Sequence, residues 1–144
     1  MPTETTIRTS VILLLESNPA ETALIEEAVH NTRVCVVTEA PDILAFLRRQ
    51  GRDAAADRPD LVLLDMDLSK AEDCEVLQEL KRDPLLKRIP VVVLASSVSY
   101  EEIFEAYDLH VNAYICKPVE RQEYLRVLGA TLHFWLDLAR LPGH

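Results

Sequence analysis

Glycine, cysteine and aromatic residues are scarce in this chain of 144 residues, which contains three glycines, three cysteines and 6% aromatic residues. The few glycines leave no linker or low-complexity segment that would divide the chain into domains. Cys35, Cys74 and Cys116 lie far apart, form no CxxC pair and have no histidine at metal-ligand spacing. The sequence therefore predicts neither a zinc site nor a disulfide framework, and we expect reduced, mostly buried thiols.

Positive charge is also scarce, with 15 Lys and Arg against 24 Asp and Glu and a net charge of −9. No basic stripe suited to phosphate neutralisation occurs, so nucleic acid is not an expected partner. No apolar run approaches membrane-spanning length, and the polar residues 1–10 lack the apolar region of a secretion signal. These absences predict no membrane association and a cytoplasmic location.

Hydrophobic residues make up 49% of the chain, enough for one ordinary core. Short continuous apolar runs alternate with helical patterns, and such runs suit strands buried on both faces of a parallel sheet. The sequence therefore predicts a doubly wound α/β fold. The expected strands are Val11 to Leu15, Val34 to Val37, Leu61 to Leu64, Val91 to Leu94 and Ala113 to Ile115.

Capping signals and core spacing predict five helices. Asn18-Pro19 begins the first helix, and Ser99 with Glu102 begins the fourth in the register of a capping box. The other expected helices are about Pro41 to Gln50, with Gly51 just past its end, about Glu75 to Lys81, and Val119–Arg121 to about Leu138.

Charged residues follow two of the predicted strands. Asp65 ends the third apolar run, and Lys117-Pro118 follows the fifth. Because ligands of open parallel sheets bind outside the carboxyl ends of the strands, Asp65 and Lys117 are expected at one edge. A carboxylate and a lysine gathered there make a site suited to phosphoryl chemistry.

The segments LLLESNPAE, LVLLDMDL, IPVVVLASS, YDLHVNAYICKP and HFWLDLARLP, in this order and spacing, resemble the receiver domains of two-component response regulators. They are most similar to small regulators that partner phytochrome-type sensor histidine kinases. The resemblance implies a flavodoxin-like sheet of five strands in the order 2-1-3-4-5. It also implies an N-terminal tail over residues 1–9, one receiver domain over 10–142 with an extended last helix, and no effector domain.

The same resemblance assigns the site. Asp65 is the expected phosphoacceptor for a kinase histidine, Lys117 pairs with the phosphoryl group, and the Lys117–Pro118 peptide bond is expected to be cis. Glu16, Asp65 and Asp67 are the expected surroundings of a Mg²⁺ ion. For Asp67 an exposed loop carboxylate is an equally weighted alternative.

Four positions depart from the receiver pattern or belong to its switch. Ser17 replaces an acid that would ligate the metal, so we expect weak Mg²⁺ binding or none. Ala95 replaces a Thr or Ser whose hydroxyl binds the phosphoryl group, and the neighbouring Ser96 could substitute only if the loop changed register. Tyr114 fills the aromatic switch position, with a half-buried strand tyrosine as the alternative.

The predicted last helix carries two apolar stripes. Leu125, Leu128, Leu132 and Trp135 form one, and Val127, Phe134, Leu138 and Leu141 form the other. We expect one stripe to pack on the sheet, and the other must be buried by another surface or remain an exposed apolar patch. We expect a homodimer through the fifth strand and last helix, involving Tyr114, Phe134, Trp135, Leu138 and Leu141. The alternative is that the extension folds back over its own domain.

Three function classes remain open. The first is a phosphoacceptor regulator in a phosphorelay, which is no enzyme beyond self-catalysed phosphoryl transfer and dephosphorylation. The second is a pseudo-receiver that binds proteins without phosphorylation, favoured by Ser17 and Ala95. The third is a phosphatase, because Asp65-Met-Asp67-Leu-Ser69 approximates the nucleophile motif of haloacid-dehalogenase-type enzymes, although the chain has no room for their cap domain.

Overall fold

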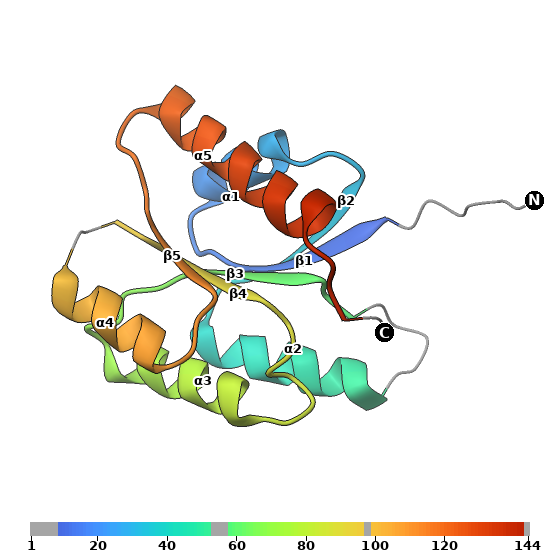
Figure 1. Cartoon of the computed structure of the whole chain (residues 1–144), viewed down its shortest axis with the longest axis vertical. Coiled ribbons are helices and arrows are strands. Elements are labelled where there is room, and N and C mark those ends of the chain that lie inside the picture. The colour runs from blue at the N-terminus through green and yellow to red at the C-terminus, as the bar shows by residue number, and fades with distance from the viewer. Residues whose placement is uncertain (1–8, 53–57, 97–98, 143–144) are drawn as a thin grey trace, which may run out of the picture.

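The computed structural model describes residues 9–52, 58–96 and 99–142, with the side chains of 49–52 excepted. Most of the predicted N-terminal tail, residues 1–8, lies outside this range. Five parallel strands form one sheet in the order β2-β1-β3-β4-β5, which confirms the predicted fold class and strand order (Figure 1). Their bounds are β1 Ser10–Leu15, β2 Thr32–Val37, β3 Leu61–Asp65, β4 Val91–Ala95 and β5 Ala113–Cys116.

The three central strands β1, β3 and β4 are buried along almost their whole length, as their continuous apolar sequences predict. The register pairs Leu15 with Leu64, Asp65 with Leu94, and Ala95 with Cys116. The carboxyl ends of these strands therefore meet at one edge of the sheet. Residues that follow the strands are brought together there.

Helices cover both faces of the sheet, and each face has its own apolar core. In Figure 1, α1 and α5 lie on one face, and α2, α3 and α4 lie on the other. The bounds are α1 Pro19–Ala28, α2 Ala40–Arg52, α3 Ala71–Arg82, α4 Tyr100–Asp108 and α5 Arg121–His133. A π-helical turn, η1 Phe134–Leu138, continues α5 and matches the predicted extension.

The predicted helix starts at Asn18 and Ser99 are confirmed. The Ala20 amide donates to the Asn18 side chain at 2.9 Å, and the Glu102 amide donates to the Ser99 hydroxyl at 3.3 Å. These bonds satisfy amides that the first helical turn leaves without partners.

Two predicted helix boundaries are wrong. α3 begins at Ala71 instead of Glu75, because its first turn is polar and apolar spacing marks only the later turns. α2 runs through Gly51 to Arg52 and does not end before this glycine. A glycine inside a helix costs about 1 kcal/mol relative to alanine, which the rest of a helix can offset.

Cys35, Cys74 and Cys116 are partly exposed, whereas the sequence predicted mostly buried thiols. Cys35 and Cys116 lie on the edge strands β2 and β5, which are covered less completely than the central strands. The Cys74 thiol donates to the Leu68 carbonyl at 3.1 Å, and burial raises its pKa to about 11.

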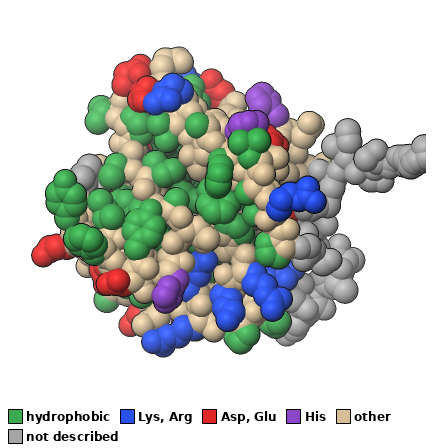
Figure 2. All heavy atoms as spheres, in the orientation of Figure 1, with side chains coloured by type: hydrophobic (Ala, Val, Ile, Leu, Met, Phe, Trp, Pro, Cys, Tyr) green, Lys and Arg blue, Asp and Glu red, His purple; other side chains and the backbone are tan. Residues whose placement is uncertain are grey.

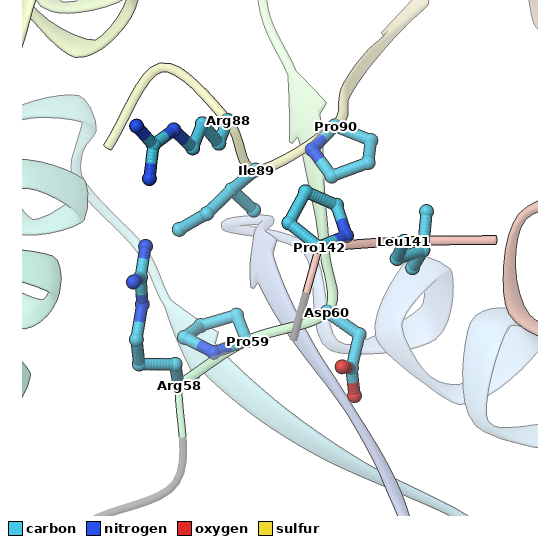
Figure 3. A pocket seen from close by; sticks show the side chains of 8 residues that line it. All are labelled: Arg58, Pro59, Asp60, Arg88, Ile89, Pro90, Leu141 and Pro142. Atoms are coloured by element: carbon cyan, nitrogen blue, oxygen red, sulfur yellow. The ribbon is translucent and has the colours of Figure 1, made fainter. Parts of the chain in front are cut away.

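The chain after η1 folds back against its own domain. Leu141 and Pro142 line a cavity of about 40 Å³ together with Pro59, Ile89 and Pro90, at the edge where the strands begin (Figure 3). In Figure 3, Pro142 lies between Pro59 and Pro90. Leu141 therefore lies against its own domain, in agreement with the alternative to a dimer contact. Among the helices in the described part of the chain, none is long and apolar enough to cross a membrane.

Candidate functional site

The carboxyl edge of the sheet brings Asp65 and Lys117 into contact. Asp65 ends β3, and Lys117 follows β5, where its amide donates to the Ala95 carbonyl at 2.7 Å. The Lys117 Nζ atom lies 2.5 Å from an Asp65 carboxylate oxygen. The two side chains are only 12% and 21% exposed, so the surrounding water screens this pair less than a surface pair.

Glu16 lies beside this pair, directly after β1, and is 6% exposed. One of its carboxylate oxygens accepts a hydrogen bond from the Asn18 amide at 3.2 Å, and the other, Oε1, is buried without a partner. Burial and, after it, the neighbouring Asp65 raise the pKa of Glu16 to about 8. The protein alone provides little to stabilise the negative charge of a buried carboxylate that lies beside another carboxylate.

Lys117 has a second partner that the sequence reasoning missed. Its Nζ atom lies 3.1 Å from a carboxylate oxygen of Glu21, in the first turn of α1. Burial lowers the pKa of Lys117, but Asp65 and Glu21 outweigh burial and the net change is upward. An acid in a first helical turn usually indicates only a favourable interaction with the helix dipole, so no local pattern marks Glu21 as a site residue.

Three carboxylates converge at this edge. Oxygen atoms of Glu16, Glu21 and Asp65 all lie within 4.8 Å of one another. Carboxylate oxygens are the ligands that Mg²⁺ and related hard cations prefer, and the unpartnered Glu16 Oε1 would gain a partner. The residues present therefore fit a divalent cation, and Glu16 and Asp65 of the predicted set are among them.

Asp67, the third predicted metal residue, does not join this group. Its exposed carboxylate accepts hydrogen bonds from the Ser69 amide at 3.0 Å and the Ser69 hydroxyl at 2.6 Å. Ser69 lowers the pKa of Asp67 through these bonds. The side chain thus stabilises its own turn, in agreement with the exposed-loop alternative.

Ser17 and Ala95, two of the predicted departures from the receiver pattern, lie at this edge of the sheet. Ser17 is exposed and lines a hollow of about 250 Å³ together with Glu16, Asp65 and Asp73, so it faces the site without a charge. Ala95 is 3% exposed and provides only a methyl group at the end of β4. Ser96 is exposed, and the following residues 97–98 lie outside the described range.

Comparison with known proteins agrees with this geometry. Residues 12–128 match the sequence profile of the response regulator receiver domain. The chain belongs to this receiver family. Response regulator Rcp1 of Synechocystis sp. is 36% identical over 137 residues, which cover 92% of this chain and 93% of Rcp1.

Solved structures of response regulators share the fold of this receiver. The phosphorylated cyanobacterial phytochrome response regulator RcpA superposes with a TM-score of 0.83 at 43% identity, covering 93% of this chain and 99% of RcpA. The Mn²⁺-bound form of Rcp1 gives a TM-score of 0.82 at 36% identity, covering 93% of this chain and 99% of Rcp1.

One expectation drawn from the family is wrong in this receiver. The Lys117–Pro118 peptide bond is trans, since the described residues contain no cis peptide. The trans form of a bond before proline is favoured by about 0.5–1 kcal/mol, and the Lys-Pro sequence by itself does not require the cis form.

Tyr114, for which the family resemblance predicts a switch role, is half-buried and packs against the core beneath α4. Its hydroxyl is buried without a hydrogen-bond partner, and burial, followed by Glu102, raises its pKa. Its backbone amide donates to the Tyr107 hydroxyl at 3.2 Å. The ring therefore points inward and presents little surface to a second subunit.

The remaining candidate interface residues differ in exposure. Trp135 is half-buried against the core, and Phe134 packs edge-on against it with ring centres 5.0 Å apart. Phe134 and Leu138 are 49% and 62% exposed. Figure 2 shows hydrophobic side chains gathered over the middle of this face, between α4 and α5. The exposed apolar residues of α4 are Tyr100, Phe104 and Tyr107, and those of η1, which continues α5, are Phe134 and Leu138.

Proposed function

We propose that this receiver accepts a phosphoryl group on Asp65 from the histidine of a sensor kinase. The observation that carries the proposal is the contact between Asp65 and Lys117 beside two further carboxylates at the carboxyl edge of the sheet. The phytochrome response regulators among its relatives support a phytochrome-type kinase as the donor.

The chemistry needs a nucleophile, charge neutralisation and an open approach. A carboxylate oxygen of Asp65 attacks the phosphorus, an oxygen–phosphorus bond forms, and the nitrogen–phosphorus bond to the kinase histidine breaks. Lys117 is placed to pair with the oxygens of the transferred group. A Mg²⁺ ion held by Glu16 and Asp65 would neutralise further negative charge. We expect this ion to bind weakly, because Ser17 provides no carboxylate.

Intact-mass measurement after incubation with a small phosphodonor and Mg²⁺ tests this proposal. The native protein should gain one acid-labile phosphoryl group, slowly, and Asp65→Asn should gain none. Asp67→Asn is the matched control, because this acid lies two residues away and should not affect labelling of Asp65. A labelled Asp65→Asn protein would show that the acceptor is elsewhere.

A pseudo-receiver remains the second candidate, because Ala95 provides no hydroxyl at the end of β4 and Ser17 provides no acid. Such a protein would act through the apolar face between α4 and α5 and would not use phosphorylation. Failure of the native protein to label with its kinase and excess Mg²⁺ would favour this candidate.

We further propose self-association through this apolar face, with Phe134 and Leu138 as the main contacts. Both side chains are large, apolar and exposed. Exposed apolar groups gathered on one face are typical of protein interfaces. Trp135, Tyr114 and Leu141 are turned toward their own domain and would contribute less.

A further inference from the structure

We propose that Glu21 supplies the carboxylate that position 17 lacks, so that Glu16, Glu21 and Asp65 together bind a divalent cation. The inference deepens the proposed function, because Asp65 belongs to both. Cation binding can nevertheless be measured without any phosphoryl transfer.

The first argument is the path of the chain. Ser17 follows Glu16 and carries no charge, and Asn18 and Pro19 then begin α1 at once. The first turn of α1 places Glu21 back at the carboxyl edge of the sheet, where it reaches Lys117. Glu21 follows Ser17 by one helical turn, so its carboxylate lies at the same edge of the sheet that Ser17 faces.

The second argument is the size of the cluster. Its oxygen atoms come from three separate elements and lie within 4.8 Å of one another. Mg²⁺ and Ca²⁺ hold oxygen ligands at about 2.0–2.6 Å, so ligands on opposite sides of the ion lie about 4–5 Å apart. The three carboxylates therefore span a distance that one cation can bridge.

The third argument comes from a group outside the cluster. Tyr124 on α5 is 3% exposed, and its hydroxyl has no hydrogen-bond partner. Tyr124 lies in the core between α1, α5 and the sheet, and burial, followed by Glu21, Asp65 and Glu16, raises its pKa. Buried hydroxyls are normally satisfied, and a water molecule on a bound cation would donate a hydrogen bond to the Tyr124 oxygen.

Lys117 balances part of the negative charge of the cluster. Its ammonium group contacts Glu21 at 3.1 Å and Asp65 at 2.5 Å, so one positive charge serves two carboxylates. A cation among the three acids would take over Glu21. The ammonium donors of Lys117 would then be available to a phosphoryl group on Asp65.

A purely structural role for Glu21 is the competing explanation, in which it only holds Lys117 in place. Glu27 provides a matched control for this role. It lies on the same helix and forms an ion pair with Arg121 at 2.6 Å, away from the cluster. Loss of an ion pair on α1 can thus be separated from loss of a ligand.

The test is Mn²⁺ titration of the full chain, followed by the electron paramagnetic resonance signal of the free ion. Glu21→Gln should weaken binding about tenfold or more, a loss at least as large as that from altering groups behind the ligands of other metal sites. Glu27→Gln should bind like the native protein. Adding Ser17→Asp to Glu21→Gln should restore most of the affinity.

The Lys117→Met background separates the two explanations. The loss caused by Glu21→Gln should persist there if Glu21 is a ligand, and should vanish if Glu21 acts only through Lys117. Native affinity in Glu21→Gln, no Mn²⁺ binding by the native protein, or disappearance of the effect without Lys117 would each overturn the inference. Because no phosphodonor is present, these outcomes are independent of whether Asp65 is phosphorylated.

Discussion

At the scale of single residues, Ala95 determines how a phosphoryl group on Asp65 can act. It is buried at the end of β4, and its carbonyl accepts a hydrogen bond from the Lys117 amide. A ligand shifts a conformational equilibrium only through interactions that differ between the two states. The missing hydroxyl removes one charge-assisted hydrogen bond, worth about 1.5–3 kcal/mol, from that difference.

Ala95→Thr should therefore restore coupling between the site and the surface. We expect sedimentation of the native protein to change little when a phosphate mimic is added, and that of Ala95→Thr to change clearly. Ser96→Ala is the control, since the exposed Ser96 hydroxyl is not expected to reach the site. A native protein that is monomeric until the mimic is added would contradict this expectation.

At the scale of elements, Lys81 joins the end of α3 to the beginning of β4 and to the residue before β5. Its ammonium group donates to the Asn112 side chain at 2.9 Å, and the same Asn112 oxygen accepts the Val91 amide at 2.8 Å. Burial lowers the pKa of Lys81 to about 8, below its ordinary value of 10.5. These partners are neutral oxygens, so no anion offsets the burial of the charge.

The free energy of unfolding should therefore contain a rising contribution from Lys81 between about pH 8 and pH 10.5. In this range the unfolded chain binds the proton and the folded chain does not, so stability increases with pH. The slope cannot exceed about 1.4 kcal/mol per pH unit for one proton. Denaturant unfolding over this pH range measures the contribution. The rise in the free energy of unfolding should be smaller in Lys81→Met than in the native protein, and the exposed Lys87→Met should show the same rise as the native protein.

At the scale of the whole molecule, the acidic site and the apolar face lie on different parts of the surface. The carboxylates gather at the carboxyl edge of the sheet, whereas Phe134 and Leu138 lie on η1, beyond the end of α5. Because Ala95 has no hydroxyl, we expect weak coupling between a phosphoryl group on Asp65 and the apolar face. Association should therefore occur without phosphate.

Phe134→Glu and Leu138→Glu should each shift the protein toward the monomer, because a charge would be buried in the proposed interface. Leu85→Glu is the control, since Leu85 is 73% exposed and belongs to the segment before β4, not to η1. Analytical ultracentrifugation over a range of concentrations measures the effect. A dimer that survives both substitutions would place the interface elsewhere.

Local sequence patterns specify the framework of the fold. The apolar runs of β1, β3 and β4 are continuous because both faces of these strands are buried, and the caps at Asn18 and Ser99 act within three residues of themselves. Such short-range and pattern-based signals can be read without a structure. They also placed Asp65 and Lys117 at one edge, since parallel strands end together.

Which side chains meet at that edge depends on packing between distant segments. Glu21 contacts Lys117 across 96 positions of the chain, and no local pattern encodes this distance. Asp67 lies close to Asp65 in sequence, yet its carboxylate turns to Ser69 because a nearby amide and hydroxyl satisfy it. Leu141 likewise has the same apolar character as Leu138, and only its place in a cavity that Pro59 and Pro90 also line separates their roles. The physical reason is that contacts between distant segments depend on how helices and strands pack, whereas strand burial and helix caps depend on neighbouring residues.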